Sequence, residues 1–199
     1  MVSKKNIMLK VFILLKIFLF LGGCAYQYSN EYNLDIEDVK KIKLNVKSFE
    51  INKDNLDIIT AENLLKNEIN KKALNKLEAW AWQKFAIEGI ENKAFLNLLK
   101  IDTNVIEKRK NKKSIFSIIS QDKEVYKISL NFDLSINTND SLIKTLKITS
   151  SLDFVLLSKY SIAQRNKVII SNLNKLIKLI DEKVTFQLNN KAFNKFVIM

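Results

Sequence analysis

Residues 126–136 read YKISLNFDLSI, and this stretch decides the fold. Its apolar and polar side chains alternate without a break, which is the pattern of a β-strand with one buried face. The same alternation returns over residues 142–156, after the polar residues 137–140, NTND. We therefore expect two long antiparallel strands joined as a hairpin.

Two earlier segments also have strand patterns. Residues 42–51 alternate in the same way, and they predict a first strand with one buried face. Residues 95–107 predict another strand, in which Leu99, Ile101, Thr103 and Val105 share a face. With the hairpin, these segments give four strands.

Two helices complete the pattern. Residues 60–88 predict the first, with Thr60 as its N-cap and Gly89 as a left-handed C-cap. Ser161 and Gln164 fit a capping box that begins the second. Each helix carries an apolar stripe. The stripes consist of Leu65, Ile69, Ala73, Leu77, Ala81 and Phe85 in the first helix, and of Ile169, Leu173, Leu176, Ile180 and Val184 in the second.

The order β-α-β-β-β-α predicts the fold class. Two amphipathic helices need a common apolar surface, and one face of a mainly antiparallel four-stranded sheet supplies it. We therefore expect an α+β two-layer sandwich formed as a single domain by residues 41–199. Residues 1–23 are expected to be a signal peptide, and residues 24–40 a lipidated N-terminus and tether.

The composition excludes several kinds of chemistry. The 199 residues include no histidine, so an imidazole base and the usual zinc ligand sets are excluded. Two of the three glycines precede the single cysteine, Cys24, and the remaining Gly89 cannot form a glycine-rich phosphate loop. Carboxylate pairs such as Glu107 with Glu124, or Asp133 with Asp153, are interpreted as solvent-facing strand residues. We expect no enzyme, no cofactor and no metal.

The N-terminus has the layout of an export signal. Lys4, Lys5 and Lys10 precede an apolar stretch, 11–21, that is too short for a membrane-spanning helix of about 20 residues. Leu21, Gly22, Gly23 and Cys24 follow, and they resemble the lipobox of bacterial lipoproteins. This resemblance implies recognition of residues 21–23 by the signal peptidase, cleavage before Cys24, and attachment of diacylglycerol and a fatty acid such as palmitate to Cys24.

The position after Cys24 bears on localisation. Ala25 stands where an aspartate retains enteric lipoproteins in the inner membrane, so the analogy implies the inner leaflet of the outer membrane, facing the periplasm. The alternative is an ordinary secretory signal in which Cys24 lies at this place by chance. Removal of residues 1–23 would leave +8 of the formal charge of +12. That charge suits an acidic partner or lipid surface, but it also fits a Lys-, Asn- and Ile-rich composition.

Two resemblances extend these expectations. From Leu77 to Tyr126 the chain resembles small alphaproteobacterial lipoproteins of unassigned function. The matching residues are Trp80, Ala81, Phe85, Gly89, Val105, Glu107, Gln121 and Tyr126. In element order, the chain is also similar to the lipopolysaccharide-assembly lipoprotein and to auxiliary lipoproteins of ABC-type lipid transport systems. The family supplies no known reaction, whereas the similarity in element order implies a non-catalytic accessory or assembly subunit of an envelope complex, with a protein partner there.

Residues 108–119 form the main candidate contact surface. The basic run contains Lys108, Arg109, Lys110, Lys112 and Lys113, and Phe116 follows it among isoleucines. Cations beside bulky apolar side chains suit a lipid or lipopolysaccharide headgroup. The alternative is a solvated connection between two strands in a lysine-rich protein.

Tryptophan supplies the last candidate contact. Trp80 and Trp82 cannot share a helix face, so we expect Trp80 at the edge of the core and Trp82 exposed as a partner or lipid contact, with simple packing as the alternative. A nucleic-acid partner is not expected, because the export signal argues against a cytosolic protein.

Overall fold

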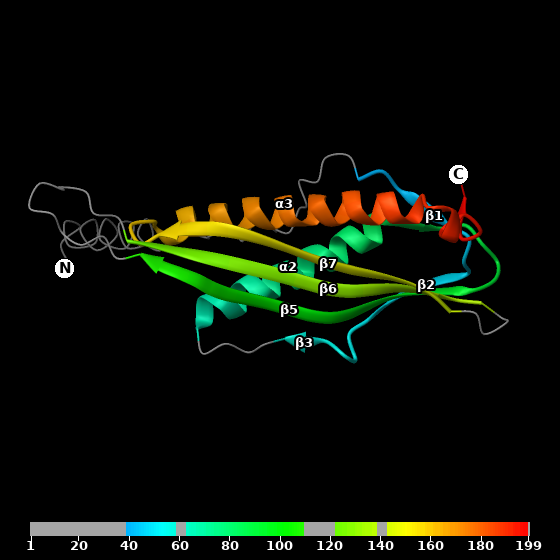
Figure 1. Cartoon of the computed structure of the whole chain (residues 1–199), viewed down its shortest axis with the longest axis horizontal. Coiled ribbons are helices and arrows are strands. Elements are labelled where there is room, and N and C mark those ends of the chain that lie inside the picture. Colours follow the sequence, from blue (N-terminus) through cyan, green and yellow to red (C-terminus); the bar gives the residue numbers. More distant parts are fainter. Residues whose placement is uncertain (1–38, 59–62, 110–121, 139–142, 199) are drawn as a thin grey trace, which may run out of the picture. The chain divides into compact units, whose positions relative to one another are not determined.

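The computed structural model describes residues 39–58, 63–109, 122–138 and 143–198 of the chain (Figure 1). These residues belong to one compact unit, Leu34–Met199, that combines two long helices with two sheets. The expected α+β fold class is confirmed. Both sheets are mixed, and neither is wholly antiparallel.

The larger sheet is built on three long antiparallel strands. They are β5 (Lys93–Arg109), β6 (Lys123–Asn137) and β7 (Ile143–Leu157). The expected hairpin is present, because β6 and β7 pair continuously from Lys123 opposite Leu157 to Asn137 opposite Ile143. Two shorter strands, β2 (Ser48–Asn52) and β3 (Asp57–Ile58), pair in parallel with β5 and make the sheet mixed.

A second, three-stranded sheet was not expected from the sequence. Its strands are β4 (Phe85–Ile87), β1 (Ile42–Leu44) and β8 (Val197–Ile198), with β1 in the middle. The single strand expected over residues 42–51 is therefore wrong. The chain bends at residues 45–47, where the amide of Asn45 donates to the Phe196 carbonyl (2.9 Å) and that of Lys47 donates to the Glu91 carbonyl (2.8 Å).

The first helix, α2 (Leu64–Lys84), differs from the expected one at both ends. Asn63 is its N-cap, with a side-chain oxygen that accepts from the Leu65 amide at 2.9 Å, whereas the expected cap, Thr60, lies outside the described residues. The helix ends at Lys84, and Phe85 begins β4. The apolar stripe is confirmed within the helix itself. Its buried members are Ile69, Ala73, Leu77 and Ala81, and Leu65 is partly buried.

Gly89 does not form the expected C-cap. It has no positive φ, and the cap position is taken by Phe85 in an extended conformation. A Cβ at Gly89 would lie 2.4 Å from the backbone of Asn45 and of Val46. The glycine is therefore required by a close approach of two backbone segments and not by a left-handed turn.

The second helix, α3 (Ile162–Leu188), confirms the expected start. Ser161 and Gln164 form the capping box, in which each side chain bonds the backbone of the other residue. The expected core-facing stripe from Ile169 to Val184 is buried. After Leu188 the chain forms a short 3₁₀ turn, Lys191–Phe193, and then β8.

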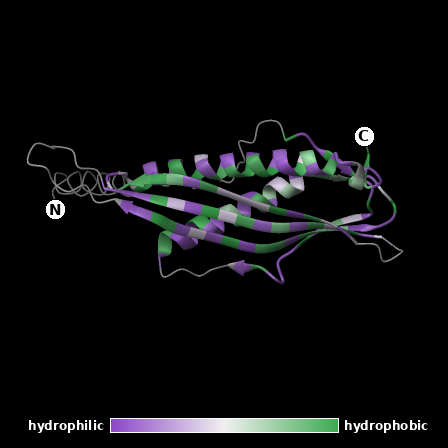
Figure 2. Cartoon of the chain, in the orientation of Figure 1, coloured by the Kyte–Doolittle hydropathy of each residue, from purple (hydrophilic) through white to green (hydrophobic). Residues whose placement is uncertain are grey.

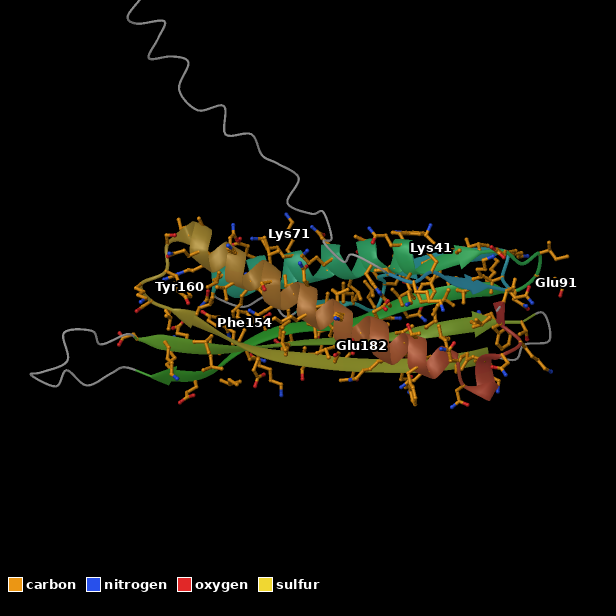
Figure 3. The ribbon with its side chains drawn as sticks, turned by 90° about the horizontal axis from the view of Figure 1, so that it is seen from above. Lys41, Lys71, Glu91, Phe154, Tyr160 and Glu182 are labelled. Atoms are coloured by element: carbon orange, nitrogen blue, oxygen red, sulfur yellow. The ribbon has the colours of Figure 1, made fainter. Side chains whose placement is uncertain are left out.

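Both helices lie on one face of the larger sheet, so the expected two-layer arrangement holds (Figure 3). Every second residue of β6, from Tyr126 to Ile136, is buried beneath them, and the hydropathy colours alternate accordingly along the strands (Figure 2). In β5 a bulge between Leu98 and Lys100 changes the expected face. Leu99 is consequently only partly buried, while Leu98 and Ile101 face the core.

Candidate functional site

The structure places the expected site residues in separate regions. Lys108 and Arg109 end β5, while Lys110, Lys112, Lys113 and Phe116 lie outside the described residues. The expected lipidation segment, Leu21, Gly22, Gly23 and Cys24, also lies outside them. Trp82 is on the last turn of α2.

A pocket of about 400 Å³ lies beside the described end of the basic run. It forms where β5 ends, β6 begins and β7 ends, beneath the first turns of the two helices. Leu65, Leu156 and Leu157 give it an apolar part. The remaining lining residues are Lys108, Asp122, Lys123, Glu124, Tyr126, Ser158 and Arg165, of which three are cationic and two acidic.

Glu124 is the most strongly bound acid of the pocket. The Tyr126 hydroxyl donates to its Oε2 at 2.6 Å, and the Lys108 ammonium lies 3.1 Å from its Oε1. The Tyr126 hydrogen bond, followed by Lys108, holds the pKa of Glu124 below its ordinary value, although partial burial opposes the change. Glu124 is therefore ionised at neutral pH and is unsuited to act as a general acid.

The pKa of Tyr126 is shifted in the opposite direction. Burial of the side chain raises the pKa of its hydroxyl, and the hydrogen bond to the Glu124 carboxylate raises it further. The ring is stacked on Phe154, with centroids 5.6 Å apart. This tyrosine stays protonated and cannot serve as a base near neutral pH, so the pair is suited to fixing the pocket wall and not to proton transfer.

Arg165 was not singled out by the sequence analysis, yet it lines the pocket from the first turn of α3. Its Nη2 donates to the Ser158 carbonyl at 3.1 Å, while its Nε is buried without a hydrogen-bond partner among the described residues. The Ser158 amide in turn donates to the Asp122 carbonyl at 2.9 Å. The guanidinium therefore adds positive charge to the pocket beside Lys108 and Lys123, whereas its buried Nε is not accessible to a ligand.

The two carboxylate pairs considered from the sequence are not formed. Asp133 lies opposite Lys147 in the β6–β7 ladder, and Asp153 lies opposite Lys127. Glu124 is opposite Lys108 in the β5–β6 ladder, whereas Glu107 is opposite Val125. Among the residues that the structure describes, no group of three acidic, histidine or cysteine side chains could hold a metal ion.

Trp82 and the basic run are not brought together. Trp82 lies seventeen positions after Leu65 of the pocket along α2, a rise of about 25 Å. Trp82 is 58% exposed, and its ring packs edge-on against Phe49 at a centroid distance of 5.3 Å. Trp80 is fully buried, which agrees with the expectation that Trp82 is the more exposed of the two.

A buried polar cluster joins the two helices and was missed by the sequence analysis. The Lys84 ammonium, in a side chain with no exposed surface, lies 2.8 Å from Asp181 Oδ1. Lys84 Nζ also donates to Thr185 Oγ1 at 2.8 Å, and Trp80 Nε1 donates to Asp181 Oδ1 at 2.8 Å. Because these groups bond one another across the helix interface, we assign them a role in fixing the register of α2 against α3.

No helix in the described part of the chain has the length and apolar character needed to span a membrane.

Comparisons with known proteins identify no family. No family model and no curated protein sequence matches the chain, so the expected alphaproteobacterial lipoprotein family is not shown. Solved structures match with low scores. A minor lipoprotein from Acinetobacter baumannii has 9% identity over 77% of this chain and 96% of that chain, with a TM-score of 0.36.

Two further solved structures give the same picture. A neuraminyllactose-binding hemagglutinin homolog from Helicobacter pylori has 10% identity, a TM-score of 0.40, and coverage of 80% of this chain and 94% of that chain. The rare lipoprotein B from Shewanella oneidensis has 10% identity, a TM-score of 0.29, and coverage of 70% and 97%. Several of the matched structures are thus bacterial lipoproteins, at a similarity too low to assign a function to this chain.

Proposed function

We propose that this chain is a non-catalytic lipoprotein of the bacterial cell envelope, held on the membrane by lipid on Cys24. The observation that carries the proposal is the sequence Leu21-Gly22-Gly23-Cys24, placed directly after a basic and then an apolar segment. Two acyl chains or more at one cysteine would anchor the protein stably, whereas a single chain would not. The first described residue, Val39, comes fifteen positions after Cys24 in the sequence.

The finer parts of the proposal concern place and role. Ala25 supports the inner leaflet of the outer membrane, with the folded domain facing the periplasm. The role is that of an accessory or assembly subunit that binds an envelope protein. Two observations support this role. The pKa of Glu124 is lowered and that of Tyr126 is raised, so neither pocket residue is suited to acid–base catalysis at neutral pH. Trp82 is exposed and can contact a partner.

The intact mass of the mature protein tests the anchor. For the wild type, we expect a chain that begins at Cys24 and carries diacylglycerol and a further acyl group. The Cys24→Ala variant should retain residues 1–23 and carry no lipid. An unmodified wild-type mass would overturn the anchor and the localisation together.

Extraction in mild detergent, followed by purification of the tagged chain, tests the accessory role. We expect a stoichiometric envelope protein to be retained and its amount to fall in Trp82→Ala. Phe186→Ala is the matched control, because Phe186 is also an exposed aromatic residue on a helix, at 80%. Equal retention by both variants would exclude Trp82 as the contact, and absence of any stoichiometric protein would exclude the accessory role.

A second candidate function is binding of a lipid or lipopolysaccharide headgroup. The observation that favours it is the position of the Arg165 guanidinium beside Lys108 and Lys123 at the start of the basic run. Phosphate groups bind such clusters through charge-assisted hydrogen bonds. The expected contacts are those of residues 108–119.

Sedimentation with vesicles tests this alternative. Binding that depends on the headgroup should be lost when Lys108, Arg109, Lys110, Lys112 and Lys113 are replaced by glutamine. The control replaces five exposed lysines elsewhere, namely Lys71, Lys127, Lys167, Lys175 and Lys178. If both sets weaken binding equally, the attraction reflects total charge, and the site is excluded.

A further inference from the structure

The end of the domain opposite the pocket carries exposed isoleucines. The turn between β4 and β5 lies against the bend after β1, since the Gly89 amide donates to the Val46 carbonyl at 3.1 Å. The C-terminal segment lies against the same bend through the bond from Asn45 to Phe196. Glu91 marks the position of the turn at this end (Figure 3). We call this surface the isoleucine tip, defined by Ile87, Ile90, Ile198, Lys47, Lys93 and Lys195.

The isoleucines of the tip are unusually accessible for their type. Ile90 is 89% exposed, Ile87 45% and Ile198 37%. A fully exposed isoleucine that is transferred from water to an apolar phase contributes roughly 1.5–3 kcal/mol. The tip therefore offers a favourable contact to an apolar environment, and Ile90 offers most of it.

Exposed lysines surround these isoleucines. Lys47 is bonded through its amide to the turn that carries Ile90, Lys93 follows the same turn, and Lys195 precedes the segment that carries Ile198. Of the acidic residues here, Glu88 is paired with Lys43 at 2.9 Å. The exposed Glu91 opposes Lys47, Lys93 and Lys195 with one negative charge, so the tip keeps a net positive charge. Cations around exposed apolar side chains suit the surface of an anionic bilayer, where each contributes about 1 kcal/mol near the surface.

The described chain begins at Val39, which packs on the core, and β1 starts three residues later in the centre of the small sheet. β1 runs toward the tip, because Ile42 lies opposite Phe85 and Leu44 lies opposite Ile87, just before the turn. Fourteen residues lie between Cys24 and Val39, and these fifteen Cα–Cα steps span up to about 50 Å when extended, so the tip can reach a bilayer that holds Cys24. The opposite end of the domain, where α3 begins, is about 40 Å away, the length of its 27 residues.

We propose that the isoleucine tip is the surface through which the domain rests on the anionic membrane, with Ile90 entering the headgroup region. This inference rests on the proposed membrane anchor. The tether is long enough for the tip to reach the bilayer, where the lysines of the tip contact lipid phosphates. The pocket at the other end, with Lys108 in its wall, then points away from the membrane, where it is accessible to a partner.

The test uses a fluorophore attached to one cysteine. In a Cys24→Ala chain, Ile90→Cys supplies the only thiol, and Ile162→Cys supplies it in the control. Ile162 is a matched residue, because it is also an isoleucine, is 85% exposed and begins α3 at the far end. The chains comprise residues 24–199 behind a histidine tag, which retains all described elements. They are held on vesicles that contain phosphatidylglycerol and a nickel-chelating lipid, and the protein itself has no histidine to compete.

We expect the fluorophore at position 90 to show a blue shift, increased emission and quenching by a spin-labelled lipid. The fluorophore at position 162 should keep its emission in water. Emission that is unchanged at position 90, or a shift at position 162 alone or at both positions, would overturn the proposal. Because the tag supplies the anchor, these outcomes do not depend on lipidation of Cys24, which the mass measurement decides separately.

Discussion

Single residues decide how the two helices are joined. Lys84 is completely buried, yet its ammonium is paired with Asp181 and bonded to Thr185. A buried charge without its partner is far more costly than the pair, since the desolvation of the ion is no longer offset. The stability of the interface between α2 and α3 therefore depends on which of the two partners is removed.

We predict that Asp181→Asn destabilises the protein more than Lys84→Met does. The first change leaves a buried cation unpaired and should cost about 3 kcal/mol. The second leaves a carboxylate that still accepts from Trp80 and is 19% exposed, so it should cost about 1 kcal/mol. Urea unfolding measures both. A larger loss in Lys84→Met would show that Lys84 acts chiefly by packing.

The hydrogen bond between Tyr126 and Glu124 leads to a prediction about how stability depends on pH. The pKa of Glu124 is lowered in the folded state, so the ionised form favours folding. This contribution is complete above the ordinary pKa of a glutamate, about 4.3, and is lost as the pH falls through the lowered folded value. Tyr126→Phe removes the main cause of the lowering.

We therefore expect Tyr126→Phe to cost about 1–2 kcal/mol at pH 7, less than a fully buried hydrogen bond to a charged group, because the Glu124 side chain is 39% exposed and solvent screens it. The difference from wild type should shrink as the pH falls below about 4, where Glu124 becomes protonated in both proteins. Urea unfolding at several pH values measures it. A difference that stays constant with pH would assign the loss to packing of the hydroxyl group.

Helices and strands with a regular local pattern were predicted from the sequence, whereas element boundaries that depend on contacts between distant residues were not. The alternation in β6 and β7 and the capping box of Ser161 are local patterns, and both were confirmed. The end of α2 was wrong because Phe85 fits the helical stripe equally well, and only its pairing with Ile42 makes it a strand. The pocket residue Arg165 gave no signal, since nothing local indicates that α3 begins beside the start of β6.

Substitution of Gly89 distinguishes two explanations of why a glycine stands after α2 and β4: a left-handed helix C-cap, or the close approach of two backbone segments. A left-handed C-cap would tolerate asparagine, which adopts that conformation more readily than other residues. The observed close approach tolerates no side chain, because any Cβ meets the backbone of Asn45 and Val46. We predict that Gly89→Asn and Gly89→Ala both lose about 2 kcal/mol or more of unfolding free energy. Retained stability in Gly89→Asn alone would restore the C-cap.

In the molecule as a whole, strands from the two ends of the described chain pair with each other and complete the small sheet. β1 near the start pairs with β8 near the end, and Phe193 and Phe196 are buried beside them. No local pattern predicts this small sheet, because its strands are two or three residues long and far apart in sequence. The same pairing brings the bend after β1, the β4–β5 turn and the C-terminal segment together as the isoleucine tip.

Truncation of the C-terminus tests whether the pairing of β1 with β8 stabilises the domain. We predict that ending the chain at Ala192 destabilises the domain by at least about 3 kcal/mol, because it removes two buried phenylalanines and leaves β1 without its β8 partner. Removal of Met199 alone is the control. Hydrogen exchange adds the location of the effect: amides of β1 and of the turn near Gly89 should lose protection, while those of β6 keep most of theirs. If the protection of β1 survives truncation, the C-terminal segment does not hold the tip together, and the fold is closed by the contact of β1 with β4.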